Sequence, residues 1–261
     1  MEGLGVGTVL LTGCDGGLGL ALLKGLLEQP SPPRHLFAAC LDPQGKLPPA
    51  TSYSRGCCHQ PVPKRSCPLA DVTDPNSIKA AVGKVREKVG SAGLNLLINN
   101  TGTTRRSTLA TETAENMSLV YATNTTGPLQ TSQAFLPLLK EAAEAGGQRE
   151  MSCSRAAIIN ISSILGSIEV AEAWEERQDI CYRCSTAALN MLTKCLALEY
   201  GSSGILCVSV DPGCVTPPLE QGMQGPVTEE QSVQGVLRLL SQLSATSNGT
   251  FWDWRGQRLP W

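Results

Sequence analysis

The sequence Thr12-Gly13-Cys14-Asp15-Gly16-Gly17-Leu18-Gly19 decides the fold of this chain. It follows an apolar run at residues 6–11, which predicts a strand, and precedes helical apolar periodicity at residues 18–27. Glycines permit a tight turn and a close approach of backbone to ligand, and the N–H groups at a helix start attract anions. A strand, a glycine turn and a helix in this order predict a dinucleotide-binding turn. A purely structural turn is the weaker alternative.

Length, charge and hydropathy narrow the class of protein. The 261 residues suffice for one α/β domain with a full core, and a net charge of −2 does not attract nucleic acid or an anionic membrane. No apolar run approaches the ~20 residues of a membrane span. The first three residues, Met1-Glu2-Gly3, lack the basic start of a signal peptide. We therefore expect a cytoplasmic protein with no nucleic-acid and no membrane partner.

Eleven cysteines are a high and odd number. Six of them lie where core or turn positions are expected, and there a thiol acts as a small apolar side chain: Cys14, Cys40, Cys153, Cys195, Cys207 and Cys214. Cys57-Cys58-His59 with Cys67 match no standard zinc spacing, so no metal site is predicted. Cys181 and Cys184 form C-x-x-C at a helix start, where thiols can become acidic. Chance spacing in a cysteine-rich chain is the preferred interpretation.

Apolar runs and helical patterns alternate along the rest of the chain. Strands are expected at residues 35–40, 94–98, 156–161, 205–210 and 250–254, and helices at residues 76–89, 113–145, 182–200 and 228–243. Asp74-Pro75 predicts a helix start, Thr228 opens a capping box, and Gly127-Pro128 predicts a break in the long helix. Prolines crowd residues 43–68 and predict an irregular loop there. The alternation predicts a single-domain α/β fold over residues 1–261, a Rossmann-type doubly wound parallel sheet.

Five signatures follow one another along the chain. They are the glycine turn at residues 12–19, Asp71, Asn99-Asn100-Thr101-Gly102, Ser163 with Tyr182, and Pro212-Gly213. Together they resemble the short-chain dehydrogenase/reductase family over essentially the whole chain. The string YRCSTAALN at residues 182–190 and the final Leu259-Pro260-Trp261 are similar to its carbonyl-reductase branch. The resemblance implies an oxidoreductase that uses a nicotinamide cofactor and acts on a small carbonyl or alcohol substrate.

The resemblance also implies a role for each signature. Cofactor-binding residues would be Gly13, Asp15, Gly17, Leu18, Gly19, Leu41, Asp71, Val72, Asn99, Gly102, Pro212, Gly213 and Val215. Among these, Asp71 would accept a hydrogen bond from the adenine amino group, and Asn99 and Gly102 would line the adenosine ribose. Ser163 would bind the substrate carbonyl oxygen, and Tyr182 would donate the proton as hydride arrives from the nicotinamide. Asn124 corresponds to the family asparagine that holds a proton-relay water.

The chain departs from the family at the lysine of the Tyr-x-x-x-Lys motif, because Thr186 occupies that position. Positions i and i+4 share one helix face, and the lysine charge lowers the tyrosine pKa from about 10. Lys194 lies about 12 Å further along the helix, and Arg183 points about 100° away around it. General acid–base catalysis contributes roughly 10²–10⁴-fold to a rate, so we expect weakened catalysis.

The residues that choose between nicotinamide cofactors are also unusual. Gly16 and Leu41 occupy the places where family members that use NADP carry basic residues. Cys40 stands where an acidic residue would favour NAD, and Asp42 falls two residues late. Pro217 replaces the threonine that meets the carboxamide. The carbonyl-reductase resemblance favours NADP(H), with NAD(H) as the alternative.

Two functions from different classes follow. One is an NAD(P)H-dependent carbonyl reductase or alcohol dehydrogenase of low or specialised activity, favoured by Ser163 and Tyr182. The other is a catalytically impaired pseudoenzyme that serves as a nucleotide-binding or protein-interaction module, favoured by Thr186. Residues 164–181 and a lid at residues 214–227 would border the substrate pocket. Apolar residues on more than one face of helix 182–200 favour a homo-oligomer, a dimer formed through the helices that contain Asn124 and Tyr182.

Overall fold

A computed structural model describes residues 3–40, 71–170, 174–213 and 227–261 of the chain. Within these residues seven strands form one sheet in the order β2-β1-β3-β4-β5-β6-β7. The parallel strands are β1 (Thr8–Thr12), β2 (His35–Ala39), β3 (Leu96–Asn99), β4 (Ala157–Ile161), β5 (Leu206–Asp211) and β6 (Thr250–Asp253). The two-residue β7 (Arg258–Leu259) pairs antiparallel with β6 at the edge. This sheet confirms the Rossmann-type fold.

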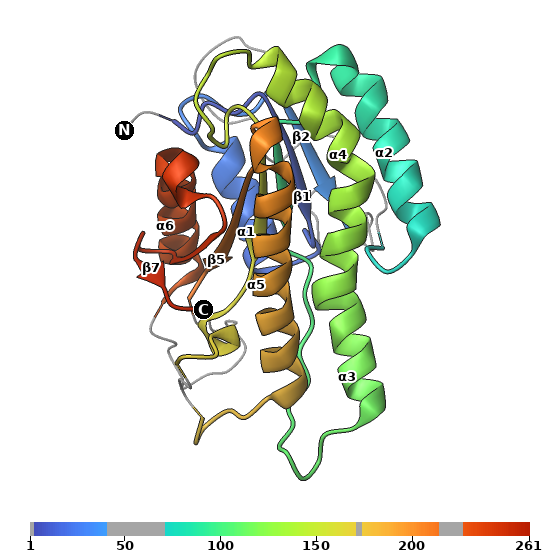
Figure 1. The fold of residues 1–261 in the computed structure, drawn as a ribbon, viewed down its shortest axis with the longest axis vertical. Coiled ribbons are helices and arrows are strands. Elements are labelled where there is room, and N and C mark those ends of the chain that lie inside the picture. Colours follow the sequence, from blue (N-terminus) through green and yellow to red (C-terminus); the bar gives the residue numbers. More distant parts are fainter. Residues whose placement is uncertain (1–2, 41–70, 171–173, 214–226) are drawn as a thin grey trace.

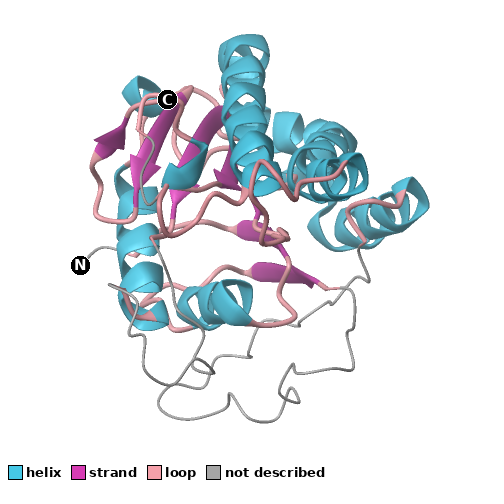
Figure 2. Ribbon diagram, turned by 90° about the horizontal axis from the view of Figure 1, so that it is seen from below, coloured by secondary structure: helices cyan, strands magenta, loops and turns pink. Residues whose placement is uncertain are grey.

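Helices cover both faces of the sheet (Figures 1 and 2). Buried residues of α1 (Gly17–Leu27) and α6 (Glu229–Gln242) pack on one face, with Val9 and Leu11 of β1. Buried residues of α2 (Pro75–Val89), α4 (Gly127–Ala145) and α5 (Ile180–Tyr200) pack on the other face, with Leu10 of β1. Successive residues of a strand point to opposite faces, so a strand covered on both sides is apolar throughout. This burial explains why the strands were predictable.

The predicted helix starts are confirmed by their caps. The Asp74 carboxylate accepts hydrogen bonds from the N–H groups of Asn76 (2.9 Å) and Ser77 (3.2 Å). Thr228 and Gln231 form the reciprocal capping box that opens α6. Each cap satisfies N–H groups that have no partner within the helix.

The predicted break in the long helix takes a different form. A π-helical segment, Ala122–Thr126, joins α3 (Ala114–Tyr121) to α4. Pro128 has no N–H to donate to the preceding turn, and a widened turn accommodates that missing bond without ending the helix. The helical path therefore continues through Gly127-Pro128, and the irregularity lies one turn earlier.

The final residues fold back onto the loop that follows β4. The main-chain oxygen of Trp261 accepts hydrogen bonds from the N–H groups of Ile168 and Glu169, both at 3.0 Å, and from Ser167 Oγ at 3.1 Å. The Trp261 ring stacks on the buried Phe251 ring of β6 with a centroid distance of 5.7 Å. The loop after β4 is therefore anchored to the edge of the sheet.

Candidate active site

A cavity of about 630 Å³ lies at the carboxyl ends of β1, β3, β4 and β5. Its walls come from the segments that follow these strands, at residues 13–19, 100–104, 161–165 and 211–213, together with Asn124, Arg177 and the first turns of α5. Ligands of doubly wound sheets bind at this edge, where the strand order reverses. The cavity is therefore the candidate active site.

The glycine turn forms one wall of this cavity and fits a phosphate group. Gly13 has φ +71°, and a Cβ there would lie 2.9 Å from the Thr101 backbone. A Cβ on Gly19 would lie only 1.9 Å from the Gly13 carbonyl oxygen. Gly16 precedes α1 and gives its first N–H groups no side-chain cap. These N–H groups suit an anion, and the predicted dinucleotide phosphates match them in charge.

Seven of the predicted cofactor residues line the cavity: Gly13, Asp15, Leu18, Gly19, Gly102, Pro212 and Gly213. Gly17 begins α1 beside them. The Asp71 carboxylate accepts hydrogen bonds from Thr73 N (2.8 Å) and Thr73 Oγ1 (2.7 Å) and is not among the described residues that line the cavity. Val72 is buried against Gly127. The cofactor roles of Asp71 and Val72 stay predictions.

Several sequence predictions lie outside the described residues. They are Leu41, Asp42, Val215, Pro217, the proline-rich loop at 43–68 with Cys57-Cys58-His59 and Cys67, Cys214, and the lid apart from Val227. Among the residues that the structure describes, no group of His, Cys, Asp and Glu is placed to hold a metal ion. No helix in the described ranges is long and apolar enough to cross a membrane.

The side chain of Asn99 does not line the cavity. It is buried, and its Nδ2 donates to Asn160 Oδ1 on the neighbouring strand at 2.8 Å. Asn160 in turn donates to Thr193 of α5, and Ser209 of β5 donates to the same hydroxyl, both at 2.8 Å. These bonds fix β3, β4, β5 and α5 to one another below the cavity. The side chain of the neighbouring Asn100 faces the glycine turn, where its Nδ2 donates to Thr12 O and Gly13 O at 3.1 Å.

Ser163 and Tyr182 meet in this cavity, as predicted for a catalytic pair. Ser163 follows β4 and its hydroxyl caps a short 3₁₀ helix by accepting from Leu165 N at 3.2 Å. Tyr182 lies in the first turn of α5. Burial raises the pKa of Tyr182 above its usual value, a hydrogen bond with Ser163 opposes the rise, and the nearby Asp211 carboxylate adds to it. The phenol is therefore protonated at neutral pH, as a proton donor must be.

Thr186 lies four residues after Tyr182 and is buried. Its hydroxyl donates to the main-chain oxygens of Tyr182 (2.9 Å) and Arg183 (3.1 Å) in its own helix. A Cβ on Gly166 would lie 2.6 Å from that hydroxyl, so the 3₁₀ helix after Ser163 packs directly on α5 here. Because its proton is already bound, the hydroxyl can only accept a hydrogen bond from the cavity. It brings no positive charge to the phenol.

Asn124 lies in the π-helical segment and bridges two walls of the cavity. Its Oδ1 accepts from Thr103 N at 2.8 Å, and its Nδ2 donates to Thr103 O and to Ser185 Oγ, both at 2.9 Å. Both amide protons are therefore used to hold residue 103 against α5. The relay water implied by the family resemblance stays a prediction.

The start of α5 depends on a polar cluster that sequence analysis did not find. Glu112 Oε2 accepts hydrogen bonds from Ser107 Oγ (2.5 Å) and Cys181 N (3.0 Å). Asp179, just before the helix, has φ +39° and donates its N–H to Ser107 O at 2.9 Å. These partners lie about 70 residues apart in sequence, so no local pattern indicates them. The cluster sets the position of the helix turn that carries Tyr182.

We expect Glu112→Gln to destabilise the protein in a pH-dependent way. The hydrogen bond from Ser107 is the main reason that the pKa of Glu112 falls from 4.5 to about 2. A lowered folded-state pKa stabilises the fold above pH 4.5, and this contribution is lost as pH falls toward 2. Thermal unfolding should show a lower Tm than wild type at pH 7 and a shrinking difference between pH 4.5 and 2. Glu87→Gln, at an exposed position on α2, is the control; an equal effect of both variants would contradict the prediction.

The thiol pair at residues 181 and 184 is not a redox pair in this fold. Cys181 is buried, its Sγ bonds to Arg105 O at 3.6 Å, and burial raises its pKa, whereas Cys184 is exposed. The acidic-thiol interpretation of Cys181 is therefore wrong, and chance spacing is favoured. Cys14, Cys40, Cys153 and Cys207 are buried as expected, but Cys195 lies exposed on α5.

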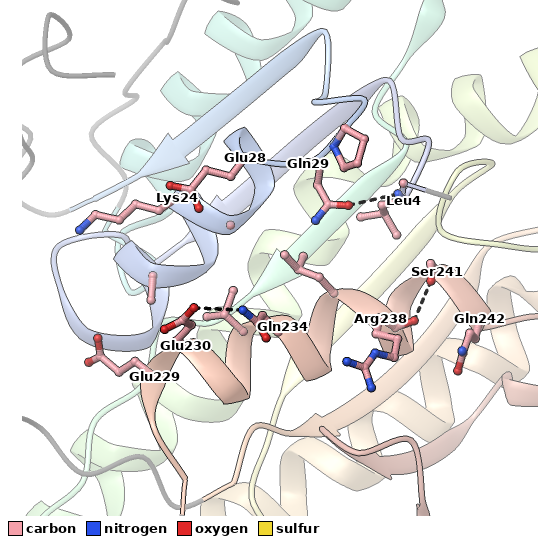
Figure 3. Close-up of a pocket in the computed structure, with 16 residues that line it drawn as sticks. Leu4, Lys24, Glu28, Gln29, Glu229, Glu230, Gln234, Arg238, Ser241 and Gln242 are labelled. Carbon is pink, nitrogen blue, oxygen red and sulfur yellow. Dashed lines mark hydrogen bonds between the residues drawn. The ribbon is translucent and has the colours of Figure 1, made fainter. Parts of the chain in front are cut away.

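A second, larger cavity of about 900 Å³ lies between α1 and α6 (Figure 3). It is lined by charged side chains of both signs, among them Lys24, Glu28, Glu229 and Arg238. Glu230 and Gln234 bond to each other along α6 at 3.1 Å. The described residues that line it differ from those that line the cavity with Ser163 and Tyr182. Size therefore does not identify the active site here, whereas the position at the strand ends does.

The doubly wound sheet, the glycine turn and the Ser163–Tyr182 pair are the features expected of a short-chain oxidoreductase, and the similarity to known proteins identifies the family. The family model described as short chain dehydrogenase matches residues 7–226, so the chain belongs to the short-chain dehydrogenase family.

Three relatives show which branch this chain resembles. An NADPH-bound carbonyl reductase from chicken fatty liver is 44% identical, with a TM-score of 0.89 over 98% of this chain and 99% of that one. Carbonyl reductase Sniffer of D. melanogaster is 33% identical, with a TM-score of 0.87 over 98% and 100%. C-signal of Myxococcus xanthus is 28% identical over 64% of this chain and 93% of that protein. Several longer dehydrogenases match over less than two thirds of their own length.

Proposed function

We propose that this protein is an NAD(P)H-dependent carbonyl reductase whose catalysis is weakened at position 186. The observation that carries the proposal is one cavity holding Ser163, Tyr182 and an uncapped helix start. A nicotinamide cofactor on the glycine turn would supply the hydride. Ser163 and Tyr182 would hydrogen-bond the carbonyl oxygen, and the Tyr182 O–H bond would break as its proton moves to that oxygen. The products are an alcohol, a tyrosinate and the oxidised cofactor.

NADP(H) is the proposed cofactor, with NAD(H) as the alternative. The support is the likeness to a carbonyl reductase whose structure contains NADPH. Titration with NADPH and NADH, followed by turnover of a carbonyl panel, tests the cofactor and the reaction together. Tyr182→Phe should keep cofactor affinity and lose turnover, because it removes the proposed proton donor and leaves the glycine turn unchanged. Turnover that survives this substitution would overturn the proposed mechanism.

The second candidate function is a pseudoenzyme that binds a nucleotide or a protein partner. Thr186 favours it, because the hydroxyl is bound to its own helix and adds no charge to the cavity. NADPH binding without reduction of any carbonyl compound would favour this function. A cytoplasmic location stays a prediction from the sequence.

We expect a homodimer formed through α5. Cys184, Met191 and Leu198 recur every seven residues, are exposed, and so share one outer face of the helix; Met191 and Leu198 are 64% and 74% exposed. Apolar side chains on a regular helix face stabilise association when a second copy covers them. Light scattering at micromolar concentration should give the dimer mass, and Met191→Glu should give the monomer. Leu109→Glu, at an exposed loop position, is the control, and a monomeric wild type would refute the expectation.

A further inference from the structure

Arg177 is the only basic side chain among the described residues that line the cavity. It lies in the loop that leads into α5 and is 29% exposed. Its Nε and Nη2 bind Asp179 Oδ2 at 2.8 and 2.7 Å. Asp179 is buried and has the only positive φ among the described non-glycine residues, +39°. A backbone conformation of this kind persists where the surrounding structure holds it, so the partner of Arg177 is fixed.

A second arginine fixes the main chain of the same loop. Arg183 Nη2 donates to Arg177 O at 2.7 Å, and Arg183 Nε donates to Gln178 O at 2.8 Å. The Arg183 guanidinium also lies 5.6 Å from the centroid of the Trp174 ring. Arg183 follows Tyr182 directly in α5, so the helix turn that carries the phenol also holds the loop that carries Arg177. The Tyr182 phenol and the Arg177 guanidinium therefore keep fixed positions relative to each other across the cavity.

The charges around Tyr182 show what Arg177 does. Asp211 faces the phenol from the end of β5, Asp179 from before α5, and Asp15 lines the same cavity from the glycine turn. Ser163 and Thr186 contribute no charge. Carboxylates alone would hold the phenol in its protonated form and oppose the tyrosinate that proton transfer leaves behind. Asp211 and Asp179 raise the pKa of Tyr182, and Arg177 lowers it.

We propose that Arg177 is a positioning residue of the reductase: held by Asp179 and Arg183, its guanidinium supplies beside Tyr182 the positive charge that the family's lysine supplies from position 186. The inference rests on the proposed function. In reduction the Tyr182 proton moves to the carbonyl oxygen, and Arg177 stabilises the resulting tyrosinate. In alcohol oxidation the same charge favours the tyrosinate that accepts the proton.

The test compares Arg177→Gln with the conservative Arg177→Lys. Titration of Tyr182 is followed by ultraviolet difference spectra, with Tyr182→Phe as the blank, and alcohol oxidation is followed against pH. Arg177→Gln should move the phenol titration upward by about one pH unit and lower oxidation near neutral pH about tenfold. Arg177→Lys should retain most of the wild-type titration of Tyr182 and most of the wild-type oxidation rate. Glu176→Gln alters an exposed charge of the same loop and should change neither.

The double variant Arg177→Gln/Thr186→Lys supplies the charge from the other side and should restore the titration if charge is what matters. An unshifted titration in a folded Arg177→Gln variant would overturn the inference, as would a rise confined to the KM of anionic carbonyl compounds. If Arg177→Gln does not fold, failure of Arg177→Lys to titrate like wild type would overturn it. The titration needs no turnover. A shifted titration in a protein that reduces no carbonyl would refute the proposed function and leave the charge effect established.

Discussion

Replacing Gly17 by leucine should abolish nicotinamide dinucleotide binding while the protein stays folded. Gly17 is the first residue of α1 and has φ +49°, and an added Cβ would meet no atom of the described residues within 4 Å beyond its own neighbours in the chain. The leucine would therefore stand in open space beside the uncapped helix start and block the approach of phosphate to backbone. The left-handed conformation costs a non-glycine residue about 1–2 kcal/mol, which a folded domain tolerates. We expect the affinity for NADPH, measured by fluorescence titration, to fall more than about 100-fold, or 2.8 kcal/mol.

Gly147 provides a matched control for the backbone strain. It follows α4, has φ +59°, and an added Cβ there would likewise lie more than 4 Å from other described residues beyond its neighbours in the chain. Gly147→Leu should therefore lose similar stability and keep its NADPH affinity. Gly19 is unsuitable for this experiment, because a Cβ there would strike the Gly13 carbonyl and disrupt the turn itself. Equal NADPH affinities of Gly17→Leu and wild type would place the cofactor elsewhere.

Replacing Thr186 by lysine should raise carbonyl-reductase turnover by an order of magnitude or more, within the ~10²–10⁴ range of acid–base assistance. Thr186 lines the cavity four residues after Tyr182, and its hydroxyl is bound to its own helix. An ammonium group at this position would stabilise the tyrosinate form of Tyr182, which burial of the phenol now disfavours. The gain should be larger for alcohol oxidation, in which Tyr182 must first lose its proton. The gain in turnover should also be larger in an Arg177→Gln background, because the charges at positions 177 and 186 act on the same phenol.

Thr186→Met separates charge from side-chain length. Methionine is long and uncharged, so it should bring the packing changes of lysine next to Gly166 without the rate gain. A lysine variant that binds NADPH yet reduces no carbonyl compound would favour the pseudoenzyme. Brisk turnover by the wild type, with no gain from lysine, would show that charge at position 186 does not limit catalysis.

Local patterns predicted the parts of the fold that depend on local physics. The strands are apolar because both faces of the sheet are covered, and Asp74 and Thr228 begin helices because their side chains satisfy N–H groups of the next turn. The two-residue β7 has no periodicity to detect. Its place follows only from pairing with β6.

In the candidate site, too, some residues could be predicted from local patterns and others only from the folded structure. Ser163, Tyr182 and the glycine turn were predictable, because their spacing within strand–turn–helix units brings them to one edge of the sheet. Asn99 was assigned to the cofactor from its motif; its side chain bonds to Asn160, and the cofactor role of this residue stays a prediction. Glu112 acts through a contact that joins distant segments, and Arg177 is held by an ion pair with Asp179, whose backbone angle is unusual. Charge near the phenol could not be inferred before these segments were placed together.

Because Trp261 binds the loop after β4, two amides of that loop report on the wall of the active site that contains Ser163. The Ile168 side chain is 86% exposed, and the amide of such a loop residue ordinarily exchanges its hydrogen with water freely. Here the amides of Ile168 and Glu169 are bonded to an oxygen more than 90 residues away in sequence. Their protection against deuterium exchange therefore measures how often Trp261 leaves the loop after Ser163, in the protein alone and before any ligand is added.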